Sequence, residues 1–104
     1  MNIQFKKGVL ELCVLSMLVW RDQYGYELAS ALSEKIQIAD GTIYPILRKL
    51  AVDGQVTTYL QESSEGPPRK YYAISPAGRK TQQDLLAEWQ LFTQHVNTIT
   101  GGVA

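Results

Sequence analysis

The stretch of residues 9–19 is apolar almost throughout, with Glu11 and Ser16 as its only polar positions. A helix of this composition has no polar face to present to water, so other elements have to cover it on more than one side. The stretch is shorter than the ~20 residues that cross a bilayer, and Arg21 and Asp22 follow it where a signal peptide would need small residues. The sequence therefore predicts a buried helix over residues 5–20, covered in part by a second subunit, and no membrane segment.

The composition narrows the classes of function. Ten basic and ten acidic residues cancel, so any binding of nucleic acid has to come from where the charges lie. The single cysteine, Cys13, can form no disulfide within the chain, which fits a reducing cytoplasm. The sequence contains no glycine-rich phosphate loop, no nucleophile patterned with a base and no metal-ligand spacing, and His95 is its one histidine. We expect a cytoplasmic protein that is not an enzyme and that uses no cofactor and no metal.

Turn and capping residues divide the middle of the chain. Residues 23–25 are expected to form a turn, which a second helix follows over residues 26–35 with an apolar stripe on one side. A third helix begins where Asp40 or Thr42 can cap it, and it ends at Gly54, because glycine commonly terminates helices. Two helices joined by a short break, the second with a polar outer face, are typical of a helix-turn-helix.

A hairpin and a long helix follow. Residues 56–60 and 69–74 are rich in β-branched and aromatic side chains, which is typical of strands, and a polar loop at 62–68 separates them. Ser75 and Pro76 then start the last helix, with serine as the cap and proline at the first helical position. The order of elements predicts a mainly helical fold with a small β hairpin, that is, a winged helix-turn-helix followed by a C-terminal helix.

The third helix has an apolar face and a polar face. Its apolar residues, which recur at the helical spacing and are expected to face the core, are Ile43, Ile46, Leu47 and Leu50. The positions left on the outer face are Thr42, Tyr44, Pro45, Arg48 and Lys49. Because the second helix of a helix-turn-helix enters the major groove of DNA, this outer face is the predicted DNA-reading surface.

The hairpin carries a second group of charges. Arg69 and Lys70 are adjacent at the start of its second strand, where a wing could bring them to phosphates. Glu62 and Glu65 in the loop would repel phosphate, so the wing tip either points away from DNA or leaves the contact to Arg69 and Lys70. Taken by itself, a pair of exposed cations such as these is also typical of an ordinary solvated surface.

The last helix carries a stripe with the 4, 3, 4, 3 spacing of a coiled-coil seam. Its members are Leu85, Trp89, Phe92, Val96 and Ile99. A lone helix would expose this stripe, and burying Trp89 and Phe92 is worth several kcal/mol at ~25 cal/mol per Å² and ~150–250 Å² for each ring. We therefore expect a homodimer; a fold-back of this helix onto its own chain is the alternative.

Four segments together resemble the PadR family of bacterial transcriptional regulators. They are residues 40–50 with the following Asp53 and Gly54, residues 66–72, residues 24–28 and residues 75–78. The first resembles the family's recognition helix, the second its wing, the third the entry to its second helix and the fourth the start of its last helix. The four segments span nearly the whole chain.

The resemblance implies a homodimeric repressor that binds double-stranded DNA, with residues 1–75 as the DNA-binding domain and residues 76–104 as a dimerisation helix and tail. It implies that Thr42, Tyr44, Pro45 and Arg48 lie at the groove and Arg69 and Lys70 at the DNA backbone. Some small regulators of this kind bind flat aromatic molecules between their dimerisation helices. A small aromatic effector between Trp89 and Phe92 is therefore an open possibility, although aromatic residues on a seam more often serve packing.

A different class of function also stays open. A winged helix can bind another protein instead of DNA, and the tyrosines Tyr44, Tyr71 and Tyr72 would suit a protein partner as well as a groove. Salt-dependent binding of duplex DNA that depends on Arg48 would separate the two hypotheses.

Overall fold

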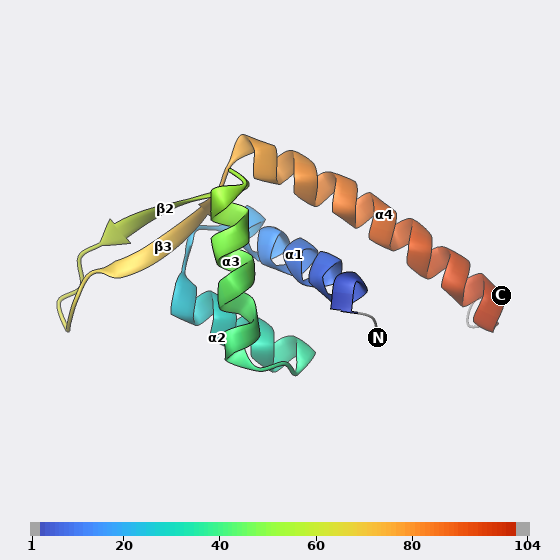
Figure 1. The fold of residues 1–104 in the computed structure, drawn as a ribbon, viewed down its shortest axis with the longest axis horizontal. Coiled ribbons are helices and arrows are strands. Elements are labelled where there is room, and N and C mark those ends of the chain that lie inside the picture. The colour runs from blue at the N-terminus through green and yellow to red at the C-terminus, as the bar shows by residue number, and fades with distance from the viewer. Residues whose placement is uncertain (1–2, 102–104) are drawn as a thin grey trace.

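The computed structural model describes residues 3–101, with side chains from residue 8 onward. The elements in chain order are α1 (Ile3–Trp20), β1 (Gln23–Tyr24), α2 (Gly25–Ile36), the 3-10 turn η1 (Asp40–Thr42), α3 (Ile43–Val52), β2 (Val56–Gln61), β3 (Arg69–Ile74) and α4 (Pro76–Thr100). The three antiparallel strands lie in the order β1-β3-β2, with the β2–β3 hairpin projecting from the three-helix body (Figure 1). The expected winged helix-turn-helix with a long last helix is confirmed.

Helix α1 forms the centre of the core. Val14 and Leu15 are completely buried and Leu18 is 1% exposed. Helices α2, α3 and α4 and strand β3 all pack against α1, so the expected cover on more than one side is present. At its C-terminal end, the buried side chain of Gln23 donates a hydrogen bond of 2.8 Å from Nε2 to the carbonyl oxygen of Met17, one of the last carbonyls without a partner inside the helix.

The expected turn at residues 23–25 is wrong. Gln23 and Tyr24 form strand β1, which pairs antiparallel with β3 in the register Gln23↔Tyr72 and Tyr24↔Tyr71. A strand of two residues is too short to show an alternating pattern, and its partner lies far along the chain, so no local pattern indicates it. The pairing fixes the start of α2, at Gly25, against the wing.

The start of the third helix also differs from the expectation. Neither Asp40 nor Thr42 caps α3 through its side chain; instead the chain makes the 3-10 turn η1 and continues into α3 at Ile43. Thr42 has helical backbone angles (φ −67°, ψ −29°), whereas a capping residue usually lies in the extended region. Pro45 falls in the first turn of α3 as expected, where its missing N–H breaks no helical hydrogen bond.

Ser75 joins the wing to α4, as the sequence predicted. Its Oγ accepts a hydrogen bond of 3.0 Å from the Gly78 backbone N–H and lies 2.6 Å from the carbonyl oxygen of Gly54 and 2.9 Å from that of Gln55. Gly78 is buried directly against the Gln55 carbonyl, and a Cβ at this position would overlap it. The first turn of α4 therefore sits closely on the loop between α3 and β2.

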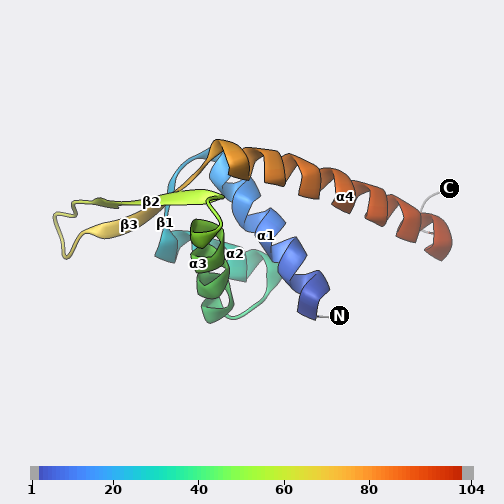
Figure 2. The ribbon, with the colours of Figure 1, turned by 45° about the horizontal axis from the view of Figure 1, so that its top comes forward.

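Helix α4 extends well beyond the winged-helix body (Figure 2). The molecule measures 54 × 28 × 22 Å and its radius of gyration is 15.4 Å, against about 13 Å for a compact domain of this length. The first half of α4 packs along α1 of the same chain, where Gln82 Nε2 donates to Ser16 Oγ at 3.1 Å. Part of the cover expected from a second subunit is thus supplied by α4 itself, while the second half of the helix projects outward.

Replacing Gly78 by alanine should destabilise the protein, because the new methyl group overlaps the Gln55 carbonyl and the joint has to open. Overpacking of this kind costs about 1–3 kcal/mol in the free energy of unfolding, which urea denaturation followed by circular dichroism would measure. Gly66→Ala is the control: no atom lies within 4 Å of a Cβ built at Gly66, and its stability should stay within about 0.5 kcal/mol of the wild type. Equal stability of the two variants would contradict the close packing at Gly78.

Candidate nucleic-acid interface

Buried residues fix the orientation of α3. Ile43, Ile46, Leu47 and Leu50 all face the core, as expected, with exposed fractions of 6% or less. Thr42, Pro45 and Arg48 consequently lie on the exposed side, and Tyr44 is half-buried at the margin. Within the part of the chain that the structure describes, Arg48 forms no ion pair, so its guanidinium is available on this face.

Lys49 differs from its neighbour on α3. Its Nζ lies 3.1 Å from Glu11 Oε1 on α1 and 3.4 Å from Asp53 Oδ2. The hydrogen bond to Glu11 and the charges of both carboxylates raise the pKa of Lys49, which keeps the ammonium charged. Lys49 is exposed but directed toward these two acids, so the structure separates it from the Arg48 face with which the sequence had grouped it.

Tyr44 faces a group of other tyrosines. Partial burial, followed by the charge of Asp40 and the nearby phenols of Tyr26, Tyr24 and Tyr72, raises the pKa of Tyr44. The hydroxyl therefore stays protonated at neutral pH and can donate a hydrogen bond. Tyr44 packs against the core cluster to which Tyr72 of β3 belongs, and α2 contacts both α3 and β3.

The two wing cations lie over tyrosine rings on opposite faces of β3. The Arg69 guanidinium carbon is 5.1 Å from the centre of the Tyr24 ring, and Lys70 Nζ is 5.5 Å from the centre of the Tyr72 ring. Such cation–π contacts hold the charges at defined positions close to the sheet. Arg69 also lies 4.0 Å from Glu27 Oε1, so its charge is partly balanced by an acid on α2.

The acidic tip of the wing lies past the last paired residues. The β2–β3 ladder ends at the pair Gln61↔Arg69, and Glu62 and Glu65 are exposed in the loop beyond it. Arg69 therefore marks the boundary between the rigid hairpin and its acidic tip. Arg69 and Lys70 thus lie at the tip end of the hairpin and not at its base, so a DNA contact by these cations brings Glu62 and Glu65 close to the backbone.

Tyr24 and Tyr26 are candidate site residues that sequence reasoning missed. Their rings are 6.3 Å apart, and Tyr24 also lies 6.0 Å from Tyr71 across the β1–β3 pairing. The distribution of the six tyrosines could have indicated them, because five of the six lie in β1, in β3 and in the first turns of α2 and α3. Only the β1 pairing shows that these segments meet.

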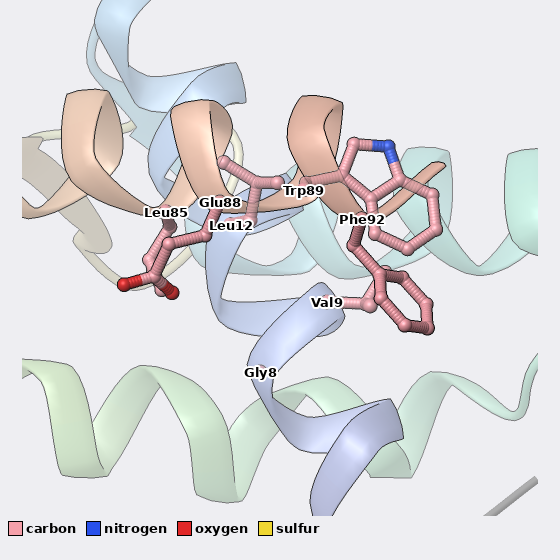
Figure 3. A pocket seen from close by; sticks show the side chains of 7 residues that line it. All are labelled: Gly8, Val9, Leu12, Leu85, Glu88, Trp89 and Phe92. Carbon is pink, nitrogen blue, oxygen red and sulfur yellow. The ribbon is translucent and has the colours of Figure 1, made fainter. Parts of the chain in front are cut away.

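The stripe on α4 divides into a covered half and an exposed half. Leu85 packs against the core and Trp89 is half-buried, whereas Phe92 is 47%, Val96 38% and Ile99 84% exposed. The Trp89 and Phe92 rings are 6.4 Å apart and both lie beside Val9 of α1 (Figure 3). With Leu12, Leu85 and Glu88 they line an open hollow of about 240 Å³ between α1 and α4.

The described part of the chain gathers no cluster of metal ligands. Among residues 3–101 no helix is both long and apolar enough to cross a membrane, and no three acidic, histidine or cysteine residues gather as metal ligands would. Cys13 is half-buried, and burial raises the pKa of its thiol, which makes it a poor nucleophile at neutral pH. His95 is exposed on α4.

The geometry is that of a winged helix with an exposed recognition face, and comparison with known proteins agrees. The model of the family described as "Transcriptional regulator PadR-like family" matches residues 14–84, from the middle of α1 into α4. The chain belongs to this family. The resemblance seen in the sequence is thereby confirmed, and the PadR-like chain is a DNA-binding regulator of transcription.

Solved structures and a curated relative support the assignment. A Streptococcus transcriptional regulator superimposes with a TM-score of 0.84 and 37% identity, covering 95% of this chain and 99% of that one. A PadR-like transcriptional regulator from Bacillus cereus superimposes with a TM-score of 0.81 and 33% identity, covering 93% and 96%. The transcriptional regulator Rv3488 of Mycobacterium tuberculosis is 30% identical over 77 residues, which are 73% of this chain and 71% of the relative.

Proposed function

We propose that this PadR-like regulator is a cytoplasmic repressor that binds an inverted-repeat operator as a homodimer, with the outer face of α3 in the major groove. The observation that carries the proposal is the orientation of α3: its buried face leaves Arg48 on the exposed side, with Tyr44 one helical turn before it at the margin of the core. In a two-fold dimer each copy would read one half-site, with centres about one helical turn, ~34 Å, apart.

The residues of this interface divide into base readers and backbone contacts. Arg48 can pair with guanine through two hydrogen bonds, and Tyr44 can contact a thymine methyl group or a phosphate. Thr42 and Pro45 stand beside them at the start of α3. Arg69 and Lys70 on the wing are proposed to contact phosphates. Lys49 would have to break its ion pair with Glu11 to contact a phosphate. We therefore propose that it attracts DNA only through its charge at a distance.

The exposed half of α4 supports the homodimer. Residues 1–75 are proposed as the DNA-binding domain and residues 76–104 as the dimerisation element, of which 102–104 lie outside the described residues. Phe92, Val96 and Ile99 leave an apolar stripe on a projecting helix, and a second copy of the same stripe is its natural cover. Leu85 and Trp89 would continue the interface onto α1.

Relief of repression by a small aromatic molecule is a further part of the proposal. The hollow beside Trp89 and Phe92 is apolar and holds one carboxylate, Glu88, which would favour a planar cation. At about 240 Å³ it is smaller than the ~300–1,000 Å³ of drug-sized sites, so a ligand would need a second wall from the partner subunit. Binding there would couple the effector to the geometry of the dimer.

Arg48→Ala should weaken operator binding by about 1–3 kcal/mol and relax the preference at one position in each half-site, because the variant removes a base contact. Lys70→Ala should instead weaken binding to operator and scrambled DNA alike. It should also lower the salt slope, that is, the slope of log Kd against log salt concentration, by about one for each phosphate that the side chain neutralises in the wild type. Fluorescence anisotropy on both duplexes across a salt series would measure the two variants, with the operator found by selection from a randomised pool.

Two results would contradict parts of this proposal. Equal weakening of both duplexes by Arg48→Ala would make Arg48 a phosphate contact and move base reading to Thr42 and Tyr44. Unchanged DNA binding in both variants would favour the protein-binding winged helix.

Val96→Lys should weaken the dimer by at least about tenfold, because it would bury an unpaired charge in the seam. Sedimentation velocity over a dilution series would measure the monomer–dimer equilibrium. Gln94→Lys adds the same charge on the side of α4 opposite the seam and should leave the dimer unchanged. A wild-type protein that sediments as a monomer at micromolar concentration would refute the homodimer.

A planar aromatic cation such as proflavine should quench the fluorescence of Trp89 in a saturable manner. The variant Trp20→Phe removes the other tryptophan, which is 88% exposed on α1, so the remaining signal reports on the hollow. Phe92→Ala in the same background should weaken binding severalfold, because it removes one aromatic wall. Quenching that rises linearly without saturation would show that the hollow binds no such ligand.

A further inference from the structure

Four tyrosines form a continuous surface between the recognition helix and the wing. We call the group of Tyr24, Tyr26, Tyr59 and Tyr71 the tyrosine surface. Tyr59 stacks on Tyr71 with ring centres 5.6 Å apart, and Tyr24 is 6.0 Å from Tyr71 on its other side. These three are direct neighbours on one face of the sheet, because the register pairs both Tyr24 and Tyr59 with Tyr71.

The tyrosine surface is continuous with the proposed DNA-reading face. Tyr26 lies in the first turn of α2, is 59% exposed and lies 6.3 Å from Tyr24. Helix α2 contacts both α3 and β3, and the phenols of Tyr26 and Tyr24 contribute to the raised pKa of Tyr44 on α3, after burial and the charge of Asp40. A partner seated on α3 would therefore meet Tyr26 and Tyr24 next, and Tyr71 beyond them.

The hydroxyl groups of this surface are not all equivalent. Tyr59 donates its hydroxyl to Asp22 Oδ2 at 2.8 Å, which also raises the pKa of Tyr59. Within the described residues, the hydroxyls of Tyr24, Tyr26 and Tyr71 form no hydrogen bond with the protein. Three donors thus remain for a partner, on rings whose centres lie 6.3 Å (Tyr26) and 6.0 Å (Tyr71) from that of Tyr24.

The charges around the surface are mostly acidic, with one cation against three carboxylates. Arg69 lies over Tyr24, but Glu27 is 4.0 Å from the same guanidinium, and Asp22 and Asp40 flank the two ends. An anionic partner such as DNA gains no attraction from charge here, so hydrogen bonds would have to hold it. A partner that offers many hydrogen-bond acceptors fits better, and the phosphate and sugar oxygens of DNA do so; tyrosine is among the side chains that contact them.

We propose that three residues of the tyrosine surface, Tyr24, Tyr26 and Tyr71, bind the DNA backbone beside the groove that α3 occupies, through neutral hydrogen bonds. Tyr59, whose hydroxyl is held by Asp22, takes no part in this contact. This inference rests on the proposed function. It explains how a chain with no net charge can hold DNA: contacts by uncharged donors add affinity without releasing counterions. Because they touch only the backbone, they act on every DNA sequence alike.

The test removes the three hydroxyls and keeps the rings. The variant Tyr24→Phe/Tyr26→Phe/Tyr71→Phe should bind the selected operator and a random-sequence duplex at least about tenfold more weakly, by the same factor for both. Its salt slope should equal that of the wild type, whereas Lys70→Ala lowers the slope. Tyr59→Phe is the matched control: it makes the same chemical change on the same surface, at a hydroxyl already bound to Asp22, and should leave affinity unchanged.

The outcomes separate this inference from the proposed function. If the triple variant binds DNA with wild-type affinity while Arg48→Ala binds more weakly, the tyrosines do not contact DNA and the proposed function still stands. Three other results overturn the neutral backbone contacts. They are an equal loss of DNA affinity in Tyr59→Phe and the triple variant, a loss of affinity in the triple variant for the operator alone, and a lowered salt slope in the triple variant. A wild-type protein that binds neither duplex overturns the proposed function itself. Circular dichroism melting curves matching the wild type show that the variants are folded.

Discussion

Val14, Leu15 and Leu18 on α1 are almost completely removed from water, and α2, α3, α4 and β3 all pack against the helix that carries them. Each of these elements takes its position from that common support. Helix α3 cannot rotate without exposing its own buried residues, so the face that points outward is decided in the core. The recognition surface is therefore as rigid as the packing around α1.

Two of the basic side chains at the candidate DNA interface are paired with acidic ones, so the interface does not form a strongly positive patch. Lys49 is held by Glu11, and Arg69 lies between the Tyr24 ring and Glu27. Arg48 is the exposed cation of α3 without an ion pair among the described residues. A protein of zero net charge has little long-range attraction for DNA, so its preference depends on where donors are held. Uncharged hydrogen-bond donors such as tyrosine would therefore contribute a larger share of the DNA affinity than in a strongly basic protein.

The two halves of helix α4 have different surroundings. Its first turn is fixed by Ser75 and by the close approach of Gly78 to Gln55, and its first half lies on α1. Its second half leaves the body, as the radius of gyration of 15.4 Å reflects. The hollow beside Trp89 and Phe92 lies where these two halves meet.

The sequence by itself determined the elements that local chemistry specifies. The apolar stretch of α1, the two faces of α3, the Ser75 cap and the 4, 3, 4, 3 stripe of α4 all follow from spacing and residue type, because each is set by neighbours within a few turns. Tertiary structure alone decided the rest. Strand β1, the turning of Lys49 toward Glu11, the packing of α4 on its own α1 and the meeting of Tyr24, Tyr26, Tyr44 and Tyr71 join residues far apart in the chain. Their partners become neighbours only once the core has formed, and no local pattern records which distant residue that will be.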